Sequence, residues 1–421
     1  MRRTPAAFIA LTLTATLIAL CGYFAWQHFH GASGRTSVLE RYADQAIATC
    51  KGSAYPPGCY DKEIPKFLDS GVSMQEAFEI TRIVQSRTKG YFFCHNLGHE
   101  IAAKEVAKDP ANWVQVLARC PMDMCANGCL HGAIQSRFNA DSLTDAERKD
   151  LIPTLGKLCE PGGAFTFTAL TQRQCYHALG HVTVYATSGK ATDAIAMCDA
   201  IAASAKAQGA VDVPGARPFD RASICYTGVF MLFFQQLEPE DFAAVAGTAP
   251  TTTEAAVSFC SALPERVRAT CHRESWTLYG SQLTTADGIE RFCSAATNPT
   301  DLWYCYQNTL FGLAAKLQLD ESAIAPLCES FPKGVMGQCF GASASRLLET
   351  DVTLAPRAAA LCKTADEHGV GEYCYGEYLF DSTSYFGTSS PSFPAVCGAL
   401  PAPWNAKCLA GDGLTVPVAV P

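Results

Sequence analysis

Cysteine recurs along this chain with a regular period, and that period limits the possible folds more than any other feature. Ten of the 21 cysteines in the 421 residues open a helix-like run that often continues with tyrosine or glycine. They are Cys59, Cys94, Cys129, Cys175, Cys225, Cys271, Cys305, Cys339, Cys374 and Cys408. Six of the nine intervals between them are 34 or 35 residues, and the other three are 46, 50 and 46. Such a period is typical of helix–turn–helix units stacked into an array.

A second set of nine cysteines precedes members of the first set. They are Cys50, Cys120, Cys159, Cys198, Cys260, Cys293, Cys328, Cys362 and Cys397. Seven of the resulting pairs are 9 to 12 residues apart, and two are 16 and 27 residues apart. Cys94 and Cys125 are then left over, so we predict that they form a tenth disulfide, while Cys21 stays free. Twenty paired cysteines are typical of an exported protein in an oxidising compartment.

The segments between the cysteines are predicted to form two helices per repeat. Residues 91–108 have apolar positions at helical spacing and end before Asp109-Pro110, and residues 111–118 begin the next helix. Each disulfide then closes the turn from the second helix of a repeat to the first helix of the next. Glycines such as Gly132 and Gly228, near the starts of the first helices, predict close contacts between helices.

We therefore predict an all-α fold, a disulfide-stapled α-hairpin repeat solenoid of about nine or ten units. The cysteine-rich helical repeat domain covers residues 41–415, and a short tail covers 416–421. Charged residues are 17% of the chain and apolar residues 48%, which allows a large buried core and excludes a disordered chain. The apolar segment Phe230–Phe234 is interpreted as part of that core.

Three features of the chain are similar to those of a known family. They are the period, the cysteine pairing and helix starts such as Cys305-Tyr306 and Cys374-Tyr375-Gly376. The chain resembles the cysteine-rich branch of the Sel1-like repeat proteins, relatives of the tetratricopeptide repeats, over residues 40–415. In that family a disulfide ties each pair of α-hairpins. Because Sel1-like arrays are mostly interaction scaffolds, the resemblance implies an envelope protein as a partner.

The N-terminus predicts the compartment. Residues 1–5 contain Arg2 and Arg3 and are predicted to be a cytoplasmic tail, and residues 6–26 carry no charge and are long enough to span a bilayer. We predict that this segment is a transmembrane signal anchor, that residues 27–40 are a linker, and that the bulk of the chain is periplasmic or extracellular. A cleaved signal peptide and a lipoprotein signal at Cys21 are the alternatives; all three export the remainder.

Histidine is concentrated at a few of the helix starts. Six of the nine histidines lie within six residues after a cysteine of the first set, namely His95, His99, His131, His177, His181 and His272. The segment His-x-Leu-Gly-His occurs twice, at His95–His99 and His177–His181. Residues four apart share one face of a helix, so each pair can bind one metal ion. The later repeats carry Thr227, Gln307 or Gly376 at the matching positions, which argues against histidines left over from repeat duplication.

We expect zinc, copper or iron as the ion, bound by imidazole and carboxylate because the cysteines are oxidised. His95, His99, His131, His177, His181 and Glu100 are the predicted ligands, and His272 is a candidate outlying ligand. Two arrangements stay open, one compact site that uses all five histidines and two sites that each use one histidine pair. Metal affinity is expected to fall as the imidazoles protonate near pH 6.

Two functions follow from these patterns. The first is an exported, membrane-tethered metal-binding protein, with catalysis left open. The second is an envelope interaction scaffold in which the histidines only donate hydrogen bonds to neighbouring carbonyls. The net charge of −8 and the absence of a basic stripe argue against a nucleic-acid partner.

Overall fold

The structure, a computed structural model, describes residues 35–88, 93–138, 145–162, 167–213, 219–236 and 239–412. The described residues form helices joined by turns, and no strand occurs among them apart from an isolated bridge between Met124 and Asp351. The predicted all-α class is therefore confirmed. The predicted anchor over residues 6–26 lies outside the described residues, and none of the helices within them is both long and apolar enough to cross a membrane.

The helices follow one another with short connections. After a helical segment over residues 35–50, the elements are α2 (Pro56–Glu63), η1 (Ile64–Ser70), α3 (Met74–Arg87), α4 (His95–Lys108), η2 (Pro110–Asn112), α5 (Trp113–Leu117), η3 (Cys125–Asn127), α6 (Gly128–Phe138), α7 (Asp145–Leu158), α8 (Ala169–Ala186), α9 (Ala191–Ala207), α10 (Arg221–Phe234), α11 (Pro239–Ala244), α12 (Thr253–Ser261), α13 (Glu265–Glu274), η4 (Ser275–Thr284), α14 (Ala286–Cys293), α15 (Pro299–Lys316), α16 (Glu321–Glu329), α17 (Lys333–Thr350), η5 (Val352–Leu354), α18 (Ala355–Glu367), α19 (Gly371–Asp381), η6 (Ser382–Phe386), α20 (Phe393–Gly398) and α21 (Trp404–Leu409).

The chain divides into two compact units, residues 1–89 and 90–421. The Cys50–Cys59 disulfide closes within the first unit, and among the described residues no disulfide joins the two. The domain predicted over residues 41–415 covers parts of both units, and residues 35–40 of the predicted linker are helical.

Local sequence signals explain the helix boundaries in the first unit. The Ser73 hydroxyl accepts a hydrogen bond from the Glu76 backbone N–H, and the Glu76 carboxylate accepts one from the Ser73 N–H, so α3 begins with a capping box. Gly71 precedes it with a φ of 85°, a left-handed conformation that suits glycine and ends η1. The apolar face of these helices buries Ile64, Met74 and Ile80.

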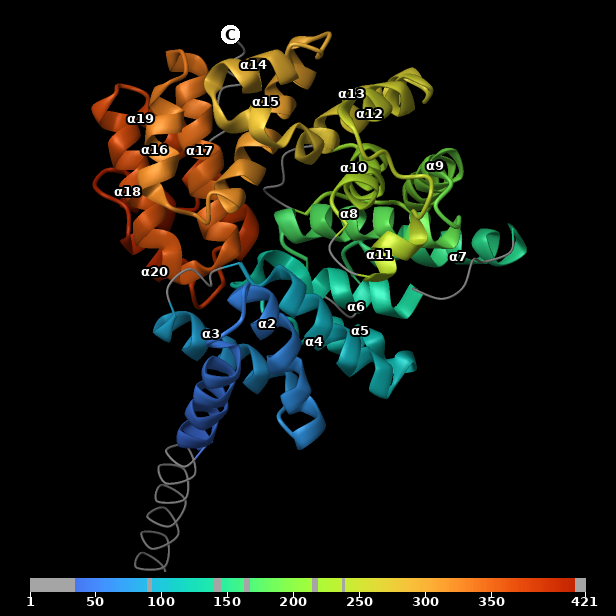
Figure 1. Cartoon of the computed structure of the whole chain (residues 1–421), viewed down its shortest axis with the longest axis horizontal. Helices are drawn as coiled ribbons and strands as arrows, with labels where there is room; N and C mark the ends of the chain where they lie inside the picture. Colours follow the sequence, from blue (N-terminus) through green and yellow to red (C-terminus); the bar gives the residue numbers. More distant parts are fainter. Residues whose placement is uncertain are drawn as a thin grey trace, which may run out of the picture. The chain divides into compact units, whose positions relative to one another are not determined.

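In the second unit the longer helices pack against one another in succession. The order of contact is α4, α6, α8, α10, α13, α15, α17 and α19, with shorter helices such as α5, α12, α16 and α18 packed beside them (Figure 1). Alternate helices along the chain therefore form one continuous layer. This layer places the three histidine-bearing helices α4, α6 and α8 side by side.

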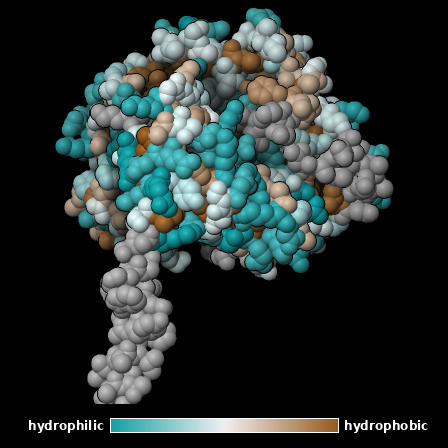
Figure 2. All heavy atoms as spheres, turned by 60° about the horizontal axis from the view of Figure 1, so that its bottom comes forward, coloured by the Kyte–Doolittle hydropathy of each residue, from teal (hydrophilic) through white to brown (hydrophobic). Residues whose placement is uncertain are grey.

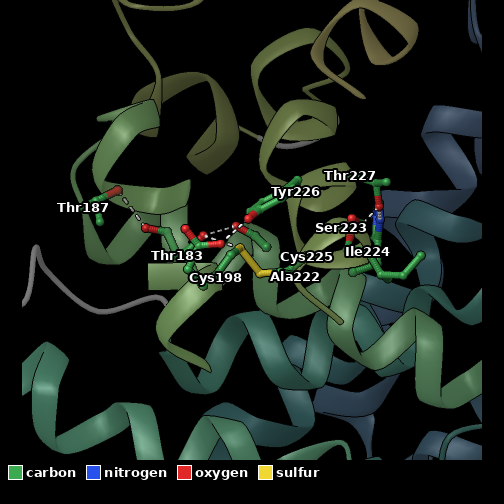
Figure 3. The surroundings of a disulfide bond; sticks show 12 residues. Thr183, Thr187, Cys198, Ala222, Ser223, Ile224, Cys225, Tyr226 and Thr227 are labelled. Atoms are coloured by element: carbon green, nitrogen blue, oxygen red, sulfur yellow. Dashed lines mark hydrogen bonds between the residues drawn. A yellow bond between two sulfur atoms is a disulfide. The ribbon is translucent and has the colours of Figure 1, made fainter. Parts of the chain in front are cut away.

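All ten predicted disulfides are present. Nine join a helix to the helix that follows the next turn, as predicted, and the tenth joins Cys94 to Cys125. Figure 3 shows the bond between Cys198 on α9 and Cys225 on α10. Ten bonds of this kind indicate folding in an oxidising compartment outside the reducing cytosol.

The C-terminal helices of the second unit return to its beginning. The Val352 backbone N–H donates to the Asp123 carbonyl over 3.0 Å, beside the Met124–Asp351 bridge. Helix α17 contacts η3, and η6 contacts α8. These contacts place residues from α17 near the histidine-bearing helices, although more than 150 residues separate them along the chain.

The surface in view in Figure 2 is mainly hydrophilic, with small apolar spots between polar side chains. The large apolar side chains that are exposed among the described residues lie far apart in the sequence, at Tyr55, Val211, Phe242, Val257, Tyr304 and Leu409. Single exposed apolar residues of this kind are normal for a soluble surface.

Candidate metal centre

The structure brings the five histidines of α4, α6 and α8 into one cluster. His131 on α6 lies between the two histidine pairs, with its ring centroid 5.2 Å from that of His95 and 5.3 Å from that of His177. The ring of His181 is 6.0 Å from that of His131. The five rings are therefore contiguous, but among the described residues only His95, His99 and His131 each offer a ligand atom within 4.8 Å of the others. The number of ions stays a prediction.

The first pair, on α4, has its two Nε2 atoms facing each other. The distance between Nε2 of His95 and Nε2 of His99 is 3.1 Å. Nδ1 of His95 lies 3.0 Å from the Ala126 carbonyl. Because a carbonyl only accepts hydrogen bonds, the Nδ1 of His95 carries the proton, and its Nε2 presents a lone pair toward His99.

An unusual turn supplies the carbonyl that orients His95. Cys125, Ala126 and Asn127 all have positive φ values, of 57°, 46° and 62°, which is rare for three consecutive residues with side chains. The Cys94–Cys125 disulfide ties this turn to the residue before His95. The Cys94–Cys125 disulfide, which departs from the general pairing pattern, therefore positions the carbonyl that accepts the hydrogen bond from Nδ1 of His95.

His131 is the least satisfied member of the cluster. Its side chain is 4% exposed, and neither Nδ1 nor Nε2 has a hydrogen-bond partner among the described residues. A buried polar group without a partner costs about 1–3 kcal/mol. One ligand atom from each of His95, His99 and His131 lies within 4.8 Å of the others. Three imidazoles thus converge on one small volume.

The second pair, on α8, repeats the geometry of the first. The Nε2 atoms of His177 and His181 are 3.2 Å apart. Nδ1 of His177 lies 2.7 Å from the Thr227 hydroxyl oxygen, and that hydroxyl donates to the Ile224 carbonyl over 2.7 Å (Figure 3). The Thr227 oxygen therefore accepts from Nδ1, so the Nε2 of His177 also presents a lone pair. Fixing the tautomer through the outer nitrogen is typical of histidines that bind metals.

Two glycines let the helices approach closely enough for this cluster. A Cβ on Gly132 of α6 would lie 2.5 Å from the His99 Cα, and a Cβ on Gly228 of α10 would lie 1.9 Å from the His177 carbonyl oxygen. Both distances are too short for any side chain. The predicted close contacts are confirmed here, and they occur beside the histidines.

Burial favours the neutral form of four of the clustered imidazoles. It lowers the pKa of His95, His131 and His181 well below the usual value of 6.5, and it lowers the pKa of His177 to about 4. The neighbouring histidines add to this effect at His95, His131 and His181. Neutral imidazole is the form that binds metals. The pH of about 6 at which the sequence predicts protonation is therefore too high for these four histidines.

A buried cation lies near the cluster. The Arg346 guanidinium of α17 lies between two aromatic rings, 4.7 Å from the Phe93 centroid and 4.5 Å from the Phe311 centroid. The Phe93 ring stacks on that of His95, with centroids 5.8 Å apart. The positive charge of Arg346 contributes to the low pKa of His95, after burial and His99.

Two predicted ligands lie elsewhere. Glu100 is exposed, because one residue beyond His99 turns its side chain by about 100° around α4. His272 on α13 stacks on Phe292, and its Nε2 lies 2.9 Å from the Phe292 carbonyl oxygen. Its ring contacts among the described residues are with Tyr279 and Phe292, and a ligand role for His272 stays a prediction.

Three contributors to the cluster were absent from the sequence prediction. Ala126 and Thr227 orient His95 and His177, and the sulfur of Met231 lies 3.2 Å from Nε2 of His177. Met231 belongs to the segment predicted to be core, and its four apolar neighbours Phe230, Leu232, Phe233 and Phe234 are indeed buried. The four-residue spacing between Thr227 and Met231 on α10 is a signal that could have linked them.

No protein-family model, curated protein or solved structure matches the chain.

Proposed function

We propose that this chain is an exported metal-binding protein whose transition-metal ion is bound by His95, His99 and His131. The observation that carries the proposal is the buried imidazole of His131, which has no partner at either nitrogen. An ion bound to one of these nitrogens removes part of that cost.

The separations between nitrogens agree with this assignment. Two imidazole nitrogens bound to one tetrahedral ion at about 2.0–2.1 Å lie about 3.3 Å apart. The observed Nε2–Nε2 distance of His95 and His99 is 3.1 Å. A direct hydrogen bond between the two rings has a similar length, but it leaves both nitrogens of His131 without a partner.

Three protein ligands leave a fourth position of a tetrahedral ion for water or a substrate. An ion in such a position can polarise a carbonyl or activate water. Catalysis is thus compatible with the site, and the histidine cluster itself supports metal binding. The alternative function is an interaction scaffold with structural histidines; the large apolar side chains exposed among the described residues lie far apart in the sequence.

The same proposal includes membrane tethering by residues 6–26 and a Sel1-like α-hairpin repeat solenoid for the second compact unit. The succession of contacts from α4 to α19 and the eight disulfides of the general pattern within this unit support the repeat. The ten disulfides support export. The uncharged segment and the two arginines before it support the tether.

The test is the metal content of the full-length protein, produced with its disulfides intact and analysed by elemental analysis. We expect at least one equivalent of zinc, copper or iron, and a melting temperature that falls when a chelator removes it. His131→Ala should lose most of the metal. His368→Ala is the matched control, because His368 is exposed and lies 3.3 Å from Glu329, away from the cluster.

If the folded wild-type protein binds none of these metals at micromolar concentrations, the metal proposal is wrong and the histidines are structural. Equal metal content in wild type, His131→Ala and His368→Ala would place the ion elsewhere and would also overturn it.

A further inference from the structure

Met231 places a thioether beside the second histidine pair. Its Sδ lies 3.2 Å from Nε2 of His177, and that nitrogen lies 3.2 Å from Nε2 of His181. Nε2 of His177 therefore contacts one further possible ligand atom on α8 and another on α10. Met231 is half-buried, while His181 is 5% exposed and its Nδ1 has no partner among the described residues.

The hydrogen bonds already described make this contact informative. Because Nδ1 of His177 donates to Thr227, its Nε2 is the unprotonated nitrogen and directs a lone pair at the sulfur. A thioether sulfur has lone pairs and no proton to donate. Even when His181 donates its Nε2 proton to this nitrogen, neither the nitrogen nor the sulfur has a proton to donate to the other, and a cation bound by both would turn this contact into a favourable one.

We propose that His177, His181 and Met231 form a second metal centre, and that it selects Cu(I). Thioether sulfur is a soft ligand that favours Cu(I), and imidazole also binds copper well. The usual zinc ligands in proteins are cysteine, histidine, aspartate and glutamate, a set that does not include methionine. This inference rests on the proposed metal-binding function and adds to it a second site and the identity of its ion.

The charge around the cluster favours the same ion. Among the described residues, the converging group beside this pair consists of imidazoles only and contains no carboxylate. The Arg346 guanidinium is 4.7 Å from the Phe93 ring, which stacks on the ring of His95, and it interacts electrostatically with the buried Glu349. Burying charge without a counter-charge is costly, so a singly charged ion is easier to accommodate here than a doubly charged one.

The experiment compares Cu(I) and Zn(II) binding by the full-length protein and by Met231→Leu. Cu(I) is supplied without oxygen or thiol reductant, so that the disulfides stay intact, and its affinity is measured against a competing chelator. We expect Met231→Leu to lower the Cu(I) affinity at least about tenfold and to leave Zn(II) affinity unchanged. Met336→Leu, another half-buried methionine in the second unit, is the matched control.

X-ray absorption of the copper-loaded wild-type protein provides a second readout that needs no variant. We expect a sulfur ligand beside imidazole nitrogens, and its loss in Met231→Leu. Copper bound only by nitrogen, or equal Cu(I) affinity in wild type and Met231→Leu, would overturn the second centre. If the protein then still binds zinc through His131, the proposed function survives; if it binds no metal at all, both proposals fail.

Discussion

Thr227 touches the cluster only through the Nδ1 of His177, and this contact determines which nitrogen of that ring faces inward. Thr227→Val keeps the shape and removes the hydroxyl, so His177 can adopt the wrong tautomer. We expect about a 10–100-fold loss of metal affinity at the second pair, measured by competition with a chelator. Thr309→Val is the control, because the buried Thr309 hydroxyl has no hydrogen-bond partner among the described residues; an equal loss in both variants would contradict the role of Thr227.

The low pKa values of His95, His131, His177 and His181 make the stability of the metal-free protein depend on pH. In the unfolded chain these side chains titrate near 6.5, so below that pH the unfolded state binds more protons than the folded state. The free energy of unfolding should therefore fall from about pH 6.5 toward pH 4, by up to about 1.4 kcal/mol per pH unit for each histidine. Urea unfolding of metal-free protein at pH 7.5 and pH 5 measures this, and equal stability at both would contradict the buried, neutral cluster.

At the scale of residues, the histidine pairs could be predicted because their spacing of four is local to one helix. Glu100 is exposed, because one step along α4 turns its side chain by about 100° from that of His99, and its predicted ligand role stays a prediction. Ala126, Thr227 and Met231 could not be placed, since they reach the cluster from other segments and only the packing of the helices brings them there.

Gly132 determines how closely α4 and α6 can pack. A methyl group at this position meets the backbone of His99, which cannot move without shifting the helix. We expect Gly132→Ala to destabilise the protein by at least about 1–3 kcal/mol and to weaken metal binding. The control is Gly334→Ala on α17, where a Cβ meets no atom within 4 Å and alanine favours the helix. Denaturant midpoints compare the two, and a neutral Gly132→Ala would show that the close approach is unnecessary.

The Cys94–Cys125 disulfide differs from the other nine in what it positions. Replacing both cysteines by alanine releases the left-handed turn that carries the Ala126 carbonyl. We expect a loss of stability of about 3–4 kcal/mol and, in the protein that remains folded, at least a tenfold loss of metal affinity. The matched variant removes Cys328–Cys339, which lies on α16 and α17. It should lose stability and keep its metal affinity. Equal metal affinities in the two variants would show that the left-handed turn does not contribute to metal binding.

At the scale of elements, the cysteine spacing predicted both the helices and all ten disulfides, because one repeated interval determines where each helix begins. It missed the left-handed turn at Cys125–Asn127, since no glycine marks it. The helix over residues 35–40 was missed for a similar reason, because it precedes the first cysteine of the pattern.

At the scale of the whole molecule, the sequence pattern could not predict the division after residue 89 or the contact of α17 with η3. Both depend on contacts between distant segments, such as Val352 with Asp123, and these contacts produce no periodic pattern in the sequence. The return places Arg346 near the histidines, together with the buried Glu349, with which Arg346 interacts electrostatically.

The most direct test of the central claim is a crystal structure of the metal-loaded, disulfide-intact protein with anomalous diffraction at the absorption edge of the bound metal. The account predicts an anomalous peak within bonding distance of His95, His99 and His131, about 2.0–2.1 Å from each ligand nitrogen. Crystals grown with excess metal that show direct contacts between the imidazoles and no peak among them would contradict it.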